Sequence, residues 1–508
     1  ESPKDNWEND SKLLEEFATW YAEKNPDVIA TYNGMKFDIP YLCKRMQVHG
    51  MNPVSLSRVA DKIERKDSEG NTIFLIHGRA HMDLLNSVKA DQKLTGNIKD
   101  RGLKTVAEWF GIKAIKFGDD INNTIAQIGT DKFREYLISD VNATDEILKI
   151  YLPLQISLAE YMKVPLKDVI EAPPSYLPTL VMARDMIKRK IIPLEDINSR
   201  YASVLQETAG NLYEGAIVQL RQKGLFEWVT KIDFASMYPS AMQTLNLSPD
   251  TCKMVAFHKI DPMVPAMEQY KFKYNDEYLT LFIPDINLKR VCEIQISRKR
   301  TGFLTEFISN SKKKRKEIRS QMDNASPEEK LILDSRQNAV KVLMNSMYGI
   351  NGQGDRRWAD LAISVATTGM CRWTTTRVLE WIDKNYRRTQ VATNVPEFKD
   401  YTGCIIEVDT DGIIVSEKID VDKLNSYLDE LILHTFGMKN YLHLEEESFG
   451  DKGFGGRCFM YKQKNYIVAN PQTPTGIIVH GAAFKSSGKP KIYDNARQII
   501  TTALVKNS

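Results

Sequence analysis

The sequence predicts a multidomain protein of mixed α/β and α+β class. The chain has 508 residues, which is several times the ~100–200 residues of a typical domain. Short apolar strands alternate with amphipathic helices over residues 1–150, whereas a β-hairpin and two long helices stand out in the second half. With 42% hydrophobic and 27% charged residues, the composition is that of an ordinary globular protein.

The first 150 residues are predicted to alternate helices and strands. Residues 11–24 place apolar side chains at spacings of three and four, which is typical of a helix with one buried face. A short apolar strand follows over 27–31, and Asn33-Gly34 is a turn signal. The pattern then predicts a helix over 40–50, a strand over 72–77, and helices over 103–110 and 131–140.

The rest of the chain contains the longest predicted helices. Residues 151–200 are predicted to be mostly helical and are interpreted as a connector. Residues 302–347 form two predicted helices joined at 324–327, with Ser326 or Asn324 as the cap of the second. The remaining elements are a strand over 229–234, a helix over 363–381, and strands over 404–408 and 413–415 that form a hairpin.

Charge and cysteine content exclude some classes of protein. The net charge is only +3, so the whole-chain charge says nothing about partners. The segment from Arg298 to Arg319, however, contains nine basic and two acidic residues, which gives it a local net charge of +7. The six cysteines lie at least 33 residues apart, which fits neither a zinc site nor a disulfide scaffold. We therefore expect a reducing, cytoplasmic location, with no membrane-spanning segment because no run of about 18 apolar residues occurs.

The hairpin turn carries two carboxylates that suit a metal site. Asp409 and Asp411 are separated by one residue, so their side chains can converge on one point. Two such carboxylates repel each other unless one is protonated or a cation lies between them. Mg²⁺ prefers oxygen ligands of this kind, and Asp233, at the end of another apolar strand, could complete the set. The alternative is an acidic turn that binds no metal.

Five short motifs stand in a fixed order between residues 200 and 490. They are Tyr213-Glu214-Gly215, residues 233–240 (DFASMYPS), residues 341–349 (KVLMNSMYG), Asp409-Thr410-Asp411 and Lys464-Asn465-Tyr466. This set resembles the motifs of the family B DNA polymerases. Segments 442–448 and 484–487 look most like T4-like phage enzymes, whereas Gly412 stands where the family usually has Ser.

The resemblance implies an RNase H-like 3′–5′ exonuclease domain followed by a polymerase palm, built on an antiparallel sheet, with a helical-hairpin fingers domain. The expected domain limits are 1–150 for a partial exonuclease domain, 151–200 for the helical connector, 201–297 and 351–490 for the palm, 298–350 for the fingers, and 491–508 for the start of the thumb.

The resemblance also implies a polymerase metal site and a nucleotide site. Two Mg²⁺ ions, about 3.5–4 Å apart in such sites, are expected on Asp233 and Asp411. Asp409 is the more peripheral ligand, and Glu447 is a weaker auxiliary candidate beside a solvated acidic run. The expected nucleotide-binding residues are Ser236, Met237, Tyr238, Arg315, Arg319, Lys341, Asn345 and Tyr348.

Helical spacing supports part of this nucleotide site independently. Lys341, Asn345 and Tyr348 stand at i, i+4 and i+7, so they share one helix face. In the family, Arg315, Arg319 and Lys341 match residues that contact the triphosphate, and Tyr238 matches a ring beneath the sugar that excludes ribonucleotides. Lys312, Lys313 and Lys314 are expected to form a merely solvated helix face. The expected DNA-binding residues are Tyr213, Gly215, Lys464 and Tyr466.

Two further motifs resemble the family's exonuclease site. Residues 33–38 (NGMKFD) match its second motif, and residues 136–140 (YLISD) match its third. The resemblance implies that Asp38 and Asp140 bind metal, with two more Mg²⁺ ions at a complete site, and that Tyr136 orients the attacking water. An Asp-x-Glu motif before Asp38 and a thumb after Ser508 are not seen. We therefore expect a second polypeptide or a longer product to supply them, and negligible proofreading by this chain alone.

The expected activity is template-directed DNA synthesis in replication, with primer-template DNA and dNTPs as substrates and a sliding clamp as a further candidate partner. A viral or phage-like source, and hence a host cytoplasm, fits the T4-like impression. The alternatives are a catalytically inactive DNA-binding replication subunit with a polymerase fold, and a stand-alone nuclease. Retention of Asp233, Asp409 and Asp411 favours an active polymerase.

Overall fold

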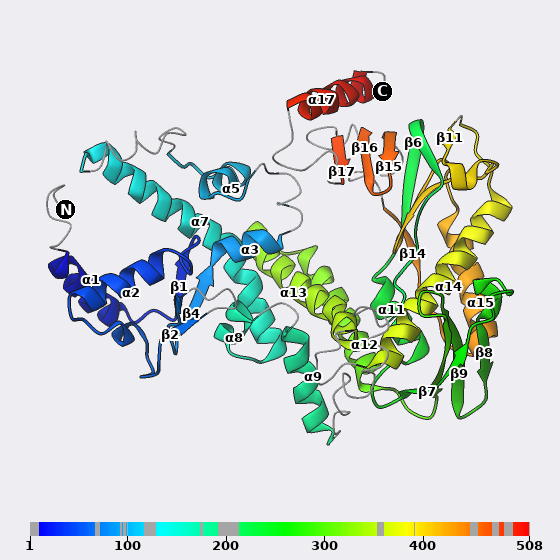
Figure 1. The fold of residues 1–508 in the computed structure, drawn as a ribbon, viewed down its shortest axis with the longest axis horizontal. Helices are drawn as coiled ribbons and strands as arrows, with labels where there is room; N and C mark the ends of the chain where they lie inside the picture. The colour runs from blue at the N-terminus through cyan, green and yellow to red at the C-terminus, as the bar shows by residue number, and fades with distance from the viewer. Residues whose placement is uncertain are drawn as a thin grey trace. The chain divides into compact units, whose positions relative to one another are not determined.

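The structure is a computed structural model that describes residues 10–66, 72–91, 94, 98, 100–115, 129–172, 176–190, 213–352, 360–390, 392–447, 456–469, 477–481 and 491–506. The chain divides into two compact units, whose elements are labelled in Figure 1. Unit 1 comprises Glu1–Pro173 and Gln321–Ala339, and unit 2 comprises Pro174–Ser320 and Val340–Ser508. Segment 484–487 and residues 191–212 lie outside the described residues.

Unit 1 contains two small pairs of strands and the helices that cover them. Strands β1 (Val28–Thr31) and β4 (Ala80–Asp83) are parallel, and β2 (Glu64–Lys66) pairs with β3 (Thr72–Phe74) in antiparallel fashion. Helices α1 (Ser11–Lys24) and α2 (Asp38–Val48), with the 3₁₀ turn η1 (Pro53–Leu56), enclose one apolar core that includes Leu14, Cys43 and Met46. A second core lies among α3 (Leu84–Ala90), α5 (Leu103–Trp109) and α7 (Asp131–Met162).

Helix α7 is much longer than predicted. The predicted helix over 131–140 is in fact a 32-residue helix that continues through Pro153 to Met162 and is capped by Lys163, which has a φ of 54°. Proline removes one backbone donor from a helix and usually breaks it. Here Ile147 and Leu158 are buried on either side of Pro153, and this packing keeps the helix continuous across the expected boundary at residue 150. Helix α8 (Leu166–Glu171) follows.

The largest sheet of unit 2 has nine described strands in the order β17-β16-β15-β6-β13-β12-β5, with β11 and β14 also paired to β6. Every pair in it is antiparallel. Its strands are β5 (Val218–Leu220), β6 (Gln222–Phe234), β11 (Thr393–Asn394), β12 (Ile405–Asp409), β13 (Gly412–Val415), β14 (Leu444–Glu447), β15 (Gly456–Lys462), β16 (Asn465–Ala469) and β17 (Ile477–His480). The predicted hairpin of two strands around residues 409–412 is confirmed as β12 and β13.

A second, four-stranded antiparallel sheet has the order β7-β10-β9-β8. Its strands are β7 (Cys252–Lys259), β8 (Lys271–Tyr274), β9 (Tyr278–Asp285) and β10 (Arg290–Ser297). Helix α14 (Leu361–Asn385) packs on β7 and β9 and on α11 (Met237–Leu245), and is almost wholly buried over residues 361–375. Helix α15 (Val421–Phe436) packs on β8 and β14, and the C-terminal α17 (Lys491–Lys506) packs on β15 and β16 of the larger sheet. Unit 2 also contains α9 (Leu177–Lys188) and the short turns η2 (Ala266–Gln269) and η3 (Pro396–Phe398).

The two long consecutive helices are confirmed as α12 (Phe303–Met322) and α13 (Pro327–Asn351). Ser326 caps α13 as predicted. The Glu329 amide donates to Ser326 Oγ at 3.3 Å, and the Ser326 amide donates back to Glu329 Oε2 at 2.9 Å. This reciprocal pair is a capping box, which satisfies two helix-terminal donors.

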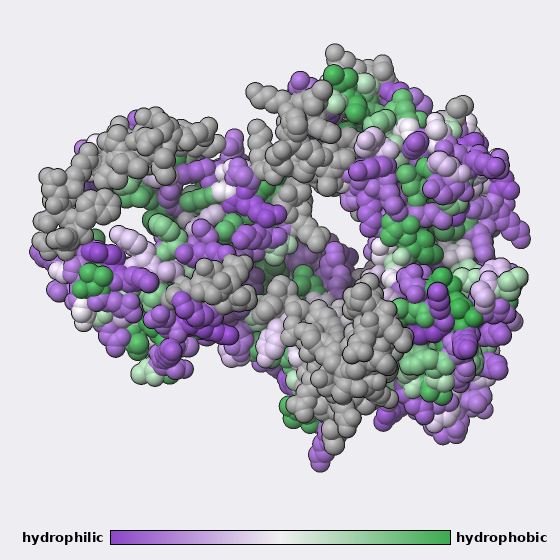
Figure 2. Space-filling model, in the orientation of Figure 1, coloured by the Kyte–Doolittle hydropathy of each residue, from purple (hydrophilic) through white to green (hydrophobic). Residues whose placement is uncertain are grey.

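The surface shown in Figure 2 is mainly hydrophilic, and the cysteines form no disulfide bonds. Hydrophilic side chains dominate the face of the molecule shown in Figure 2, and hydrophobic ones are scattered in small groups. Among the described residues, no helix is long and apolar enough to cross a membrane. All six cysteines are free and buried.

Candidate active site

Three predicted aspartates lie at neighbouring strand ends of the nine-stranded sheet. Asp233 stands opposite Gly412 in the β6–β13 pair, and the Phe234 amide donates to the Asp411 carbonyl at 2.9 Å. Asp409 ends β12, and Thr410 makes the turn with a φ of 61°. The Thr410 amide donates to the Ile217 carbonyl at 2.9 Å, which fixes the turn to the segment before β5. Strand pairing therefore brings together residues that lie far apart in the sequence.

Two lysines pair with these carboxylates. Lys231 Nζ lies 2.8 Å from Asp233 Oδ2, and Lys464 Nζ lies 2.8 Å from Asp409 Oδ1. Residues 231 and 233 share one face of β6 because side chains alternate along a strand. The negative charge at these strand ends is thus partly balanced by the chain's own ammonium groups.

Asp409 and Asp411 line one cavity of about 340 Å³. Lys231, Glu407, Tyr466 and His480 also line it, with Thr410, Gly412 and Ile414. A Cβ built on Gly412 would lie 2.6 Å from Lys231 Cε and 3.4 Å from Asp233 Oδ2. Glycine at this position therefore leaves room for the Lys231 side chain, and the Asp233 carboxylate lies beside the hairpin turn.

The carboxylates fit a divalent cation by their chemistry, but the described residues do not form a closed metal cage. In the described part of the chain, no group of three or more His, Cys, Asp and Glu side chains is gathered closely enough to hold an ion. The convergence of all three aspartates on a metal therefore stays a prediction. The side chain of Glu447 lies outside the described residues, and its backbone belongs to β14.

Sequence reasoning missed three residues of this cavity. Burial raises the pKa of Glu407 to about 7, although the Lys464 amide donates to its Oε1 at 2.5 Å. The His480 ring stacks on Tyr466 with centroids 4.8 Å apart. Lys231 and Glu407 each lie two residues before a predicted aspartate, Asp233 and Asp409, and so share a strand face with it. That spacing could have indicated them, whereas no local signal marks His480.

A second group of predicted residues forms a chain of tyrosines. The rings of Tyr238 and Tyr348 stack with centroids 4.3 Å apart and an interplanar angle of 19°. The Tyr348 hydroxyl lies 3.1 Å from the Tyr213 hydroxyl, to which it donates. Ser236 is the residue directly before α11 and has a φ of 53°. The side chain of Met237 is buried in the core, with 3% exposed, so only its backbone remains available to a ligand.

Other predicted nucleotide-binding residues lie on the two long helices. Lys341 and Asn345 are exposed on α13, and Arg319 is exposed on α12. Burial and the nearby charge of Arg319 lower the pKa of Arg315, while Glu445 opposes that effect. Glu445 stands opposite Asp233 in the β14–β6 pair. Arg315 therefore interacts electrostatically with Glu445, on the strand that pairs with the end of β6.

The expectation that Lys312 is merely solvated is wrong. Its side chain is half-buried, Nζ donates to Ser240 Oγ at 2.9 Å, and the Tyr441 ring centroid lies 5.8 Å away. Burial lowers the pKa of Lys312 to about 8. The aliphatic part of a lysine can pack between elements while its ammonium reaches a polar group. Lys313 and Lys314 are exposed, as expected.

The predicted exonuclease residues lie in unit 1. Asp38 is the first residue of α2, and burial together with the negative charge of Asp83 raises its pKa. Asp83, which the sequence did not single out, accepts from the Asn33 amide at 2.8 Å and the Met35 amide at 3.1 Å, and it also caps α3. This aspartate fixes the turn that presents Asp38.

Tyr136 and Asp140 share one face of α7, as predicted. Lys104 forms an ion pair with Asp140, and its Nζ lies 4.4 Å from the centroid of the Tyr136 ring. Burial lowers the pKa of Lys104. Nothing in the sequence around Lys104 indicated this role, because it lies more than thirty residues before Asp140.

Comparisons with known proteins give a consistent result. The family model for DNA polymerase family B matches residues 166–447, and the model for DNA polymerase family B, exonuclease domain, matches residues 5–106. The first match contains Asp233, Lys341 and Asp411, and the second contains Asp38. Tyr136 and Asp140 lie between the two matched segments.

Similar proteins include DNA polymerase 1 of Pyrococcus abyssi, which is 27% identical over 482 residues, covering 91% of this chain and 53% of that protein. The DNA polymerase of Thermococcus gorgonarius is 26% identical over 471 residues, covering 90% of this chain and 53% of that protein. The chain thus spans about half the length of these curated relatives.

Among solved structures, the family B DNA polymerase from the hyperthermophilic archaeon Pyrobaculum calidifontis matches with a TM-score of 0.62 and 22% identity. The match covers 98% of this chain and 59% of that one, and it shows a shared fold. These relatives are archaeal, and the T4-like, phage-like type expected from the sequence stays a prediction.

Proposed function

This chain belongs to DNA polymerase family B, whose model covers more than half of it, and we propose that it performs template-directed DNA synthesis. In this reaction the 3′-hydroxyl of a primer attacks a deoxynucleoside triphosphate. The observation that carries the proposal is the pairing of β6 with β13, which sets Asp233 beside the Asp409–Asp411 turn. Arg315 interacts electrostatically with Glu445, which stands opposite Asp233 in the β14–β6 pair.

Family B polymerases and their exonuclease domains use divalent metals. We propose that Asp233 and Asp411 hold two Mg²⁺ ions, with Asp409 as a peripheral ligand, and that Asp38 and Asp140 contribute to a second pair at a complete exonuclease site. When bound, such ions lower the pKa of the attacking hydroxyl and stabilise charge on the phosphates. Lys231 and Lys464 would balance the aspartate charges until the ions bind.

The proposed nucleotide site combines charge and shape. Lys341, Arg315 and Arg319 would neutralise the triphosphate, and Asn345 would hydrogen-bond the nucleotide from the same helix face as Lys341. The ring of Tyr238, supported by Tyr348, would lie under the sugar and exclude a 2′-hydroxyl. Ser236 and Met237 are also proposed to contact the nucleotide. Met237 would do so through its backbone amide, because its side chain is buried.

Primer-template DNA is the proposed polymer substrate. Lys464 and Tyr466 would contact DNA near the primer terminus, and Tyr213 and Gly215 are the other proposed DNA-binding residues. Base pairing with the template would select the nucleotide, so we expect no preferred DNA sequence. Lysine and arginine contacts to phosphates make such binding weaken steeply with salt.

The domain limits stay a proposal, with residues 1–150 as a partial exonuclease domain, 201–297 and 351–490 as palm, and 298–350 as fingers. We also propose residues 151–200 as the helical connector and residues 491–508 as the start of the thumb. In the proposed exonuclease site Tyr136 would orient the attacking water. A second polypeptide, a sliding clamp and the cytoplasmic location also remain predictions.

A primer-extension assay with Mg²⁺ tests the function. We expect extension by the wild type, no extension by Asp411→Ala, and unchanged extension by Asp422→Ala, which removes an exposed carboxylate of α15. DNA binding without extension in the wild type would support the inactive binding subunit instead. Shortening of the primer without extension would support the stand-alone nuclease.

A further inference from the structure

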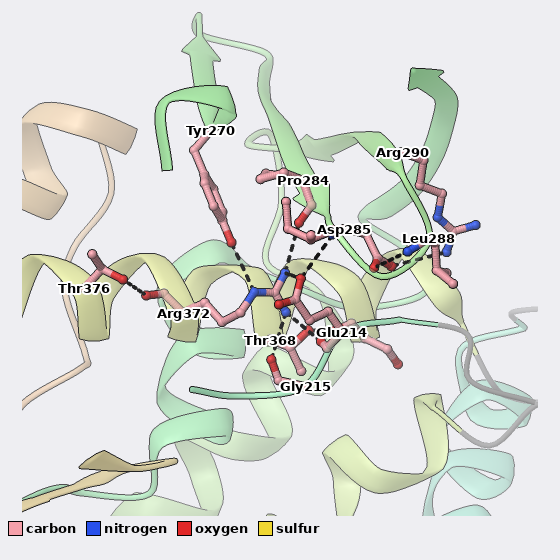
Figure 3. A network of polar contacts seen from close by, with 12 residues as sticks. Glu214, Gly215, Tyr270, Pro284, Asp285, Leu288, Arg290, Thr368, Arg372 and Thr376 are labelled. Atoms are coloured by element: carbon pink, nitrogen blue, oxygen red, sulfur yellow. Dashed lines mark hydrogen bonds and ion pairs between the residues drawn. The ribbon is translucent and has the colours of Figure 1, made fainter. Parts of the chain in front are cut away.

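Arg372 is a buried arginine of α14 with only 7% of its surface exposed. Its Nη1 donates to the carbonyls of Glu214 at 2.6 Å and Gly215 at 2.9 Å. Its Nε donates to the Tyr270 hydroxyl at 3.2 Å, and Nη2 donates to the Pro284 carbonyl at 3.2 Å. Figure 3 shows the guanidinium surrounded by these acceptors from three separate parts of the chain.

The segment held by Arg372 has no strand partner of its own. Residues 213–217 are neither helix nor strand, and β5 begins at Val218. In the described part of the chain, the carbonyls of Glu214 and Gly215 have no backbone donor from a paired strand, and a buried guanidinium needs acceptors for its five N–H groups. Each therefore satisfies the other. The carboxylate of Glu214 adds charge compensation, with Oε2 at 3.8 Å from Arg372 Nη2.

This short segment joins two halves of the proposed active site. At its start, the Tyr213 hydroxyl meets Tyr348, which stacks on Tyr238. At its end, the Ile217 carbonyl accepts from the Thr410 amide, and Val218 pairs with Asp409. The carbonyls bound by Arg372 lie between these two connections. A shift of the segment would therefore displace the nucleotide side and the aspartate side relative to each other.

We propose that Arg372 is a positioning residue for nucleotide addition. It fixes the segment from Tyr213 to Ile217 on α14 and β9, and so sets the distance between the stacked tyrosines and the aspartate turn. Arg372 is buried, so it contributes through the segment and does not touch the substrate. This inference rests on the proposed polymerase function, because that function gives the two connected ends their roles.

The variants Arg372→Lys and Arg372→Gln test the proposal in the full chain. A lysine keeps the charge, but its single ammonium cannot reproduce the planar fork of the guanidinium. Loss of buried charge-assisted hydrogen bonds of this kind corresponds to an effect of about tenfold or more. We expect about tenfold faster amide hydrogen exchange at residues 213–217 and about tenfold weaker discrimination of dATP over ATP.

Arg221→Lys is the matched control. Arg221 is also buried, with 8% exposed, and it donates to Asp383 Oδ2 at 2.7 Å and Gln219 Oε1 at 3.0 Å. Its side chain is bound outside the segment, so this variant should lower the melting temperature without changing sugar discrimination. Equal loss of discrimination in both variants would reduce Arg372 to an ordinary structural residue and overturn the proposal.

Tyr270→Phe provides a milder variant in case the Arg372 variants do not fold. It removes only the hydroxyl that accepts from Arg372 Nε, and we expect exchange at 213–217 to become about threefold faster, within the range of one lost hydrogen bond. If an active Arg372 or Tyr270 variant showed unchanged hydrogen exchange at 213–217 and unchanged sugar discrimination, the positioning role of Arg372 would be rejected. The proposed polymerase function would still stand. Absence of extension by the wild type would reject the proposed function, and with it this role.

Discussion

Tyr238 and Tyr348 stack face to face, with ring centroids 4.3 Å apart. Tyr238 belongs to the helix that follows β6, and Tyr348 belongs to the last turns of α13. Aromatic pairs in this geometry contribute about 0.5–1.5 kcal/mol beyond the burial of their area. The stack therefore restrains the Tyr238 ring, as the proposed selection of the sugar by shape requires.

Tyr238→Ala should admit ribonucleotides. Removal of the ring opens the space that a 2′-hydroxyl would need, and we expect the ratio of ribonucleotide to deoxynucleotide incorporation to rise by about tenfold or more, the effect of about 1.4 kcal/mol. Single-nucleotide extension with ATP and dATP measures this ratio. Tyr278→Ala, which removes a partly exposed ring of β9, should leave it unchanged. An unaltered ratio in Tyr238→Ala would show that another residue selects the sugar.

Lys341→Ala should impair the use of dNTPs. The ammonium of Lys341 is exposed on the same helix face as Asn345, and charge-assisted contacts to phosphate are about twice as strong as neutral hydrogen bonds. We expect kcat/KM for the dNTP to fall by about 100-fold, equivalent to about 2.7 kcal/mol. Steady-state extension kinetics test this, with Lys330→Ala, an exposed lysine nearer the start of α13, as the control. Equal effects in the two variants would argue against a specific phosphate contact.

Lys312 should make stability rise with pH. Its pKa is about 8 in the folded state, against 10.5 as its ordinary value, so the unfolded chain binds more protons between these two values. The free energy of unfolding should therefore increase as pH rises from 8 to 10.5, by at most about 3 kcal/mol. The Ser240 hydroxyl and the Tyr441 ring favour the charged form and so oppose the effect of burial on this pKa.

Urea denaturation at pH 7 to 10.5 measures the effect. Lys312→Met should lose this rise relative to the wild type, whereas Lys313→Met, the exposed neighbour, should keep it. If the difference in stability between wild type and Lys312→Met were the same at every pH, the ammonium of Lys312 would not be perturbed by burial.

Ser326→Ala should destabilise α13. The substitution removes the hydroxyl that accepts from the Glu329 amide and donates to Glu329 Oε2, and loss of an N-cap typically costs about 1 kcal/mol. We expect the free energy of unfolding to fall by this amount in the transition that unfolds the helix. Circular dichroism in urea monitors that transition. Ser320→Ala near the end of α12, whose hydroxyl donates to the Glu317 carbonyl, should cost much less. No decrease would mean that packing alone holds this helix end.

Local patterns in the sequence were sufficient for much of the fold, and they supplied the candidate site residues, whose roles stay predictions. The capping box of α13 and the strand-turn-strand pattern around Asp409 each lie within a few residues, so propensity and turn chemistry specify them directly. The order of the five motifs likewise singled out Asp233, Lys341 and Asp411 as candidates before any contact was known. Helix α7 marks the limit of this approach, because buried packing on both sides of Pro153 outweighs the local signal for a break.

The tertiary structure decided which of several equivalent side chains are special. Lys312 and Lys313 are adjacent and chemically identical, yet only Lys312 meets Ser240, which lies 72 residues earlier in the chain. The acceptors of Arg372 come from segments about 90 to 160 residues away, and no periodicity records them. Such contacts depend on how distant elements pack, so the sequence determined the motifs and their chemistry, and only the packed chain determined which lysines and arginines hold those motifs in place.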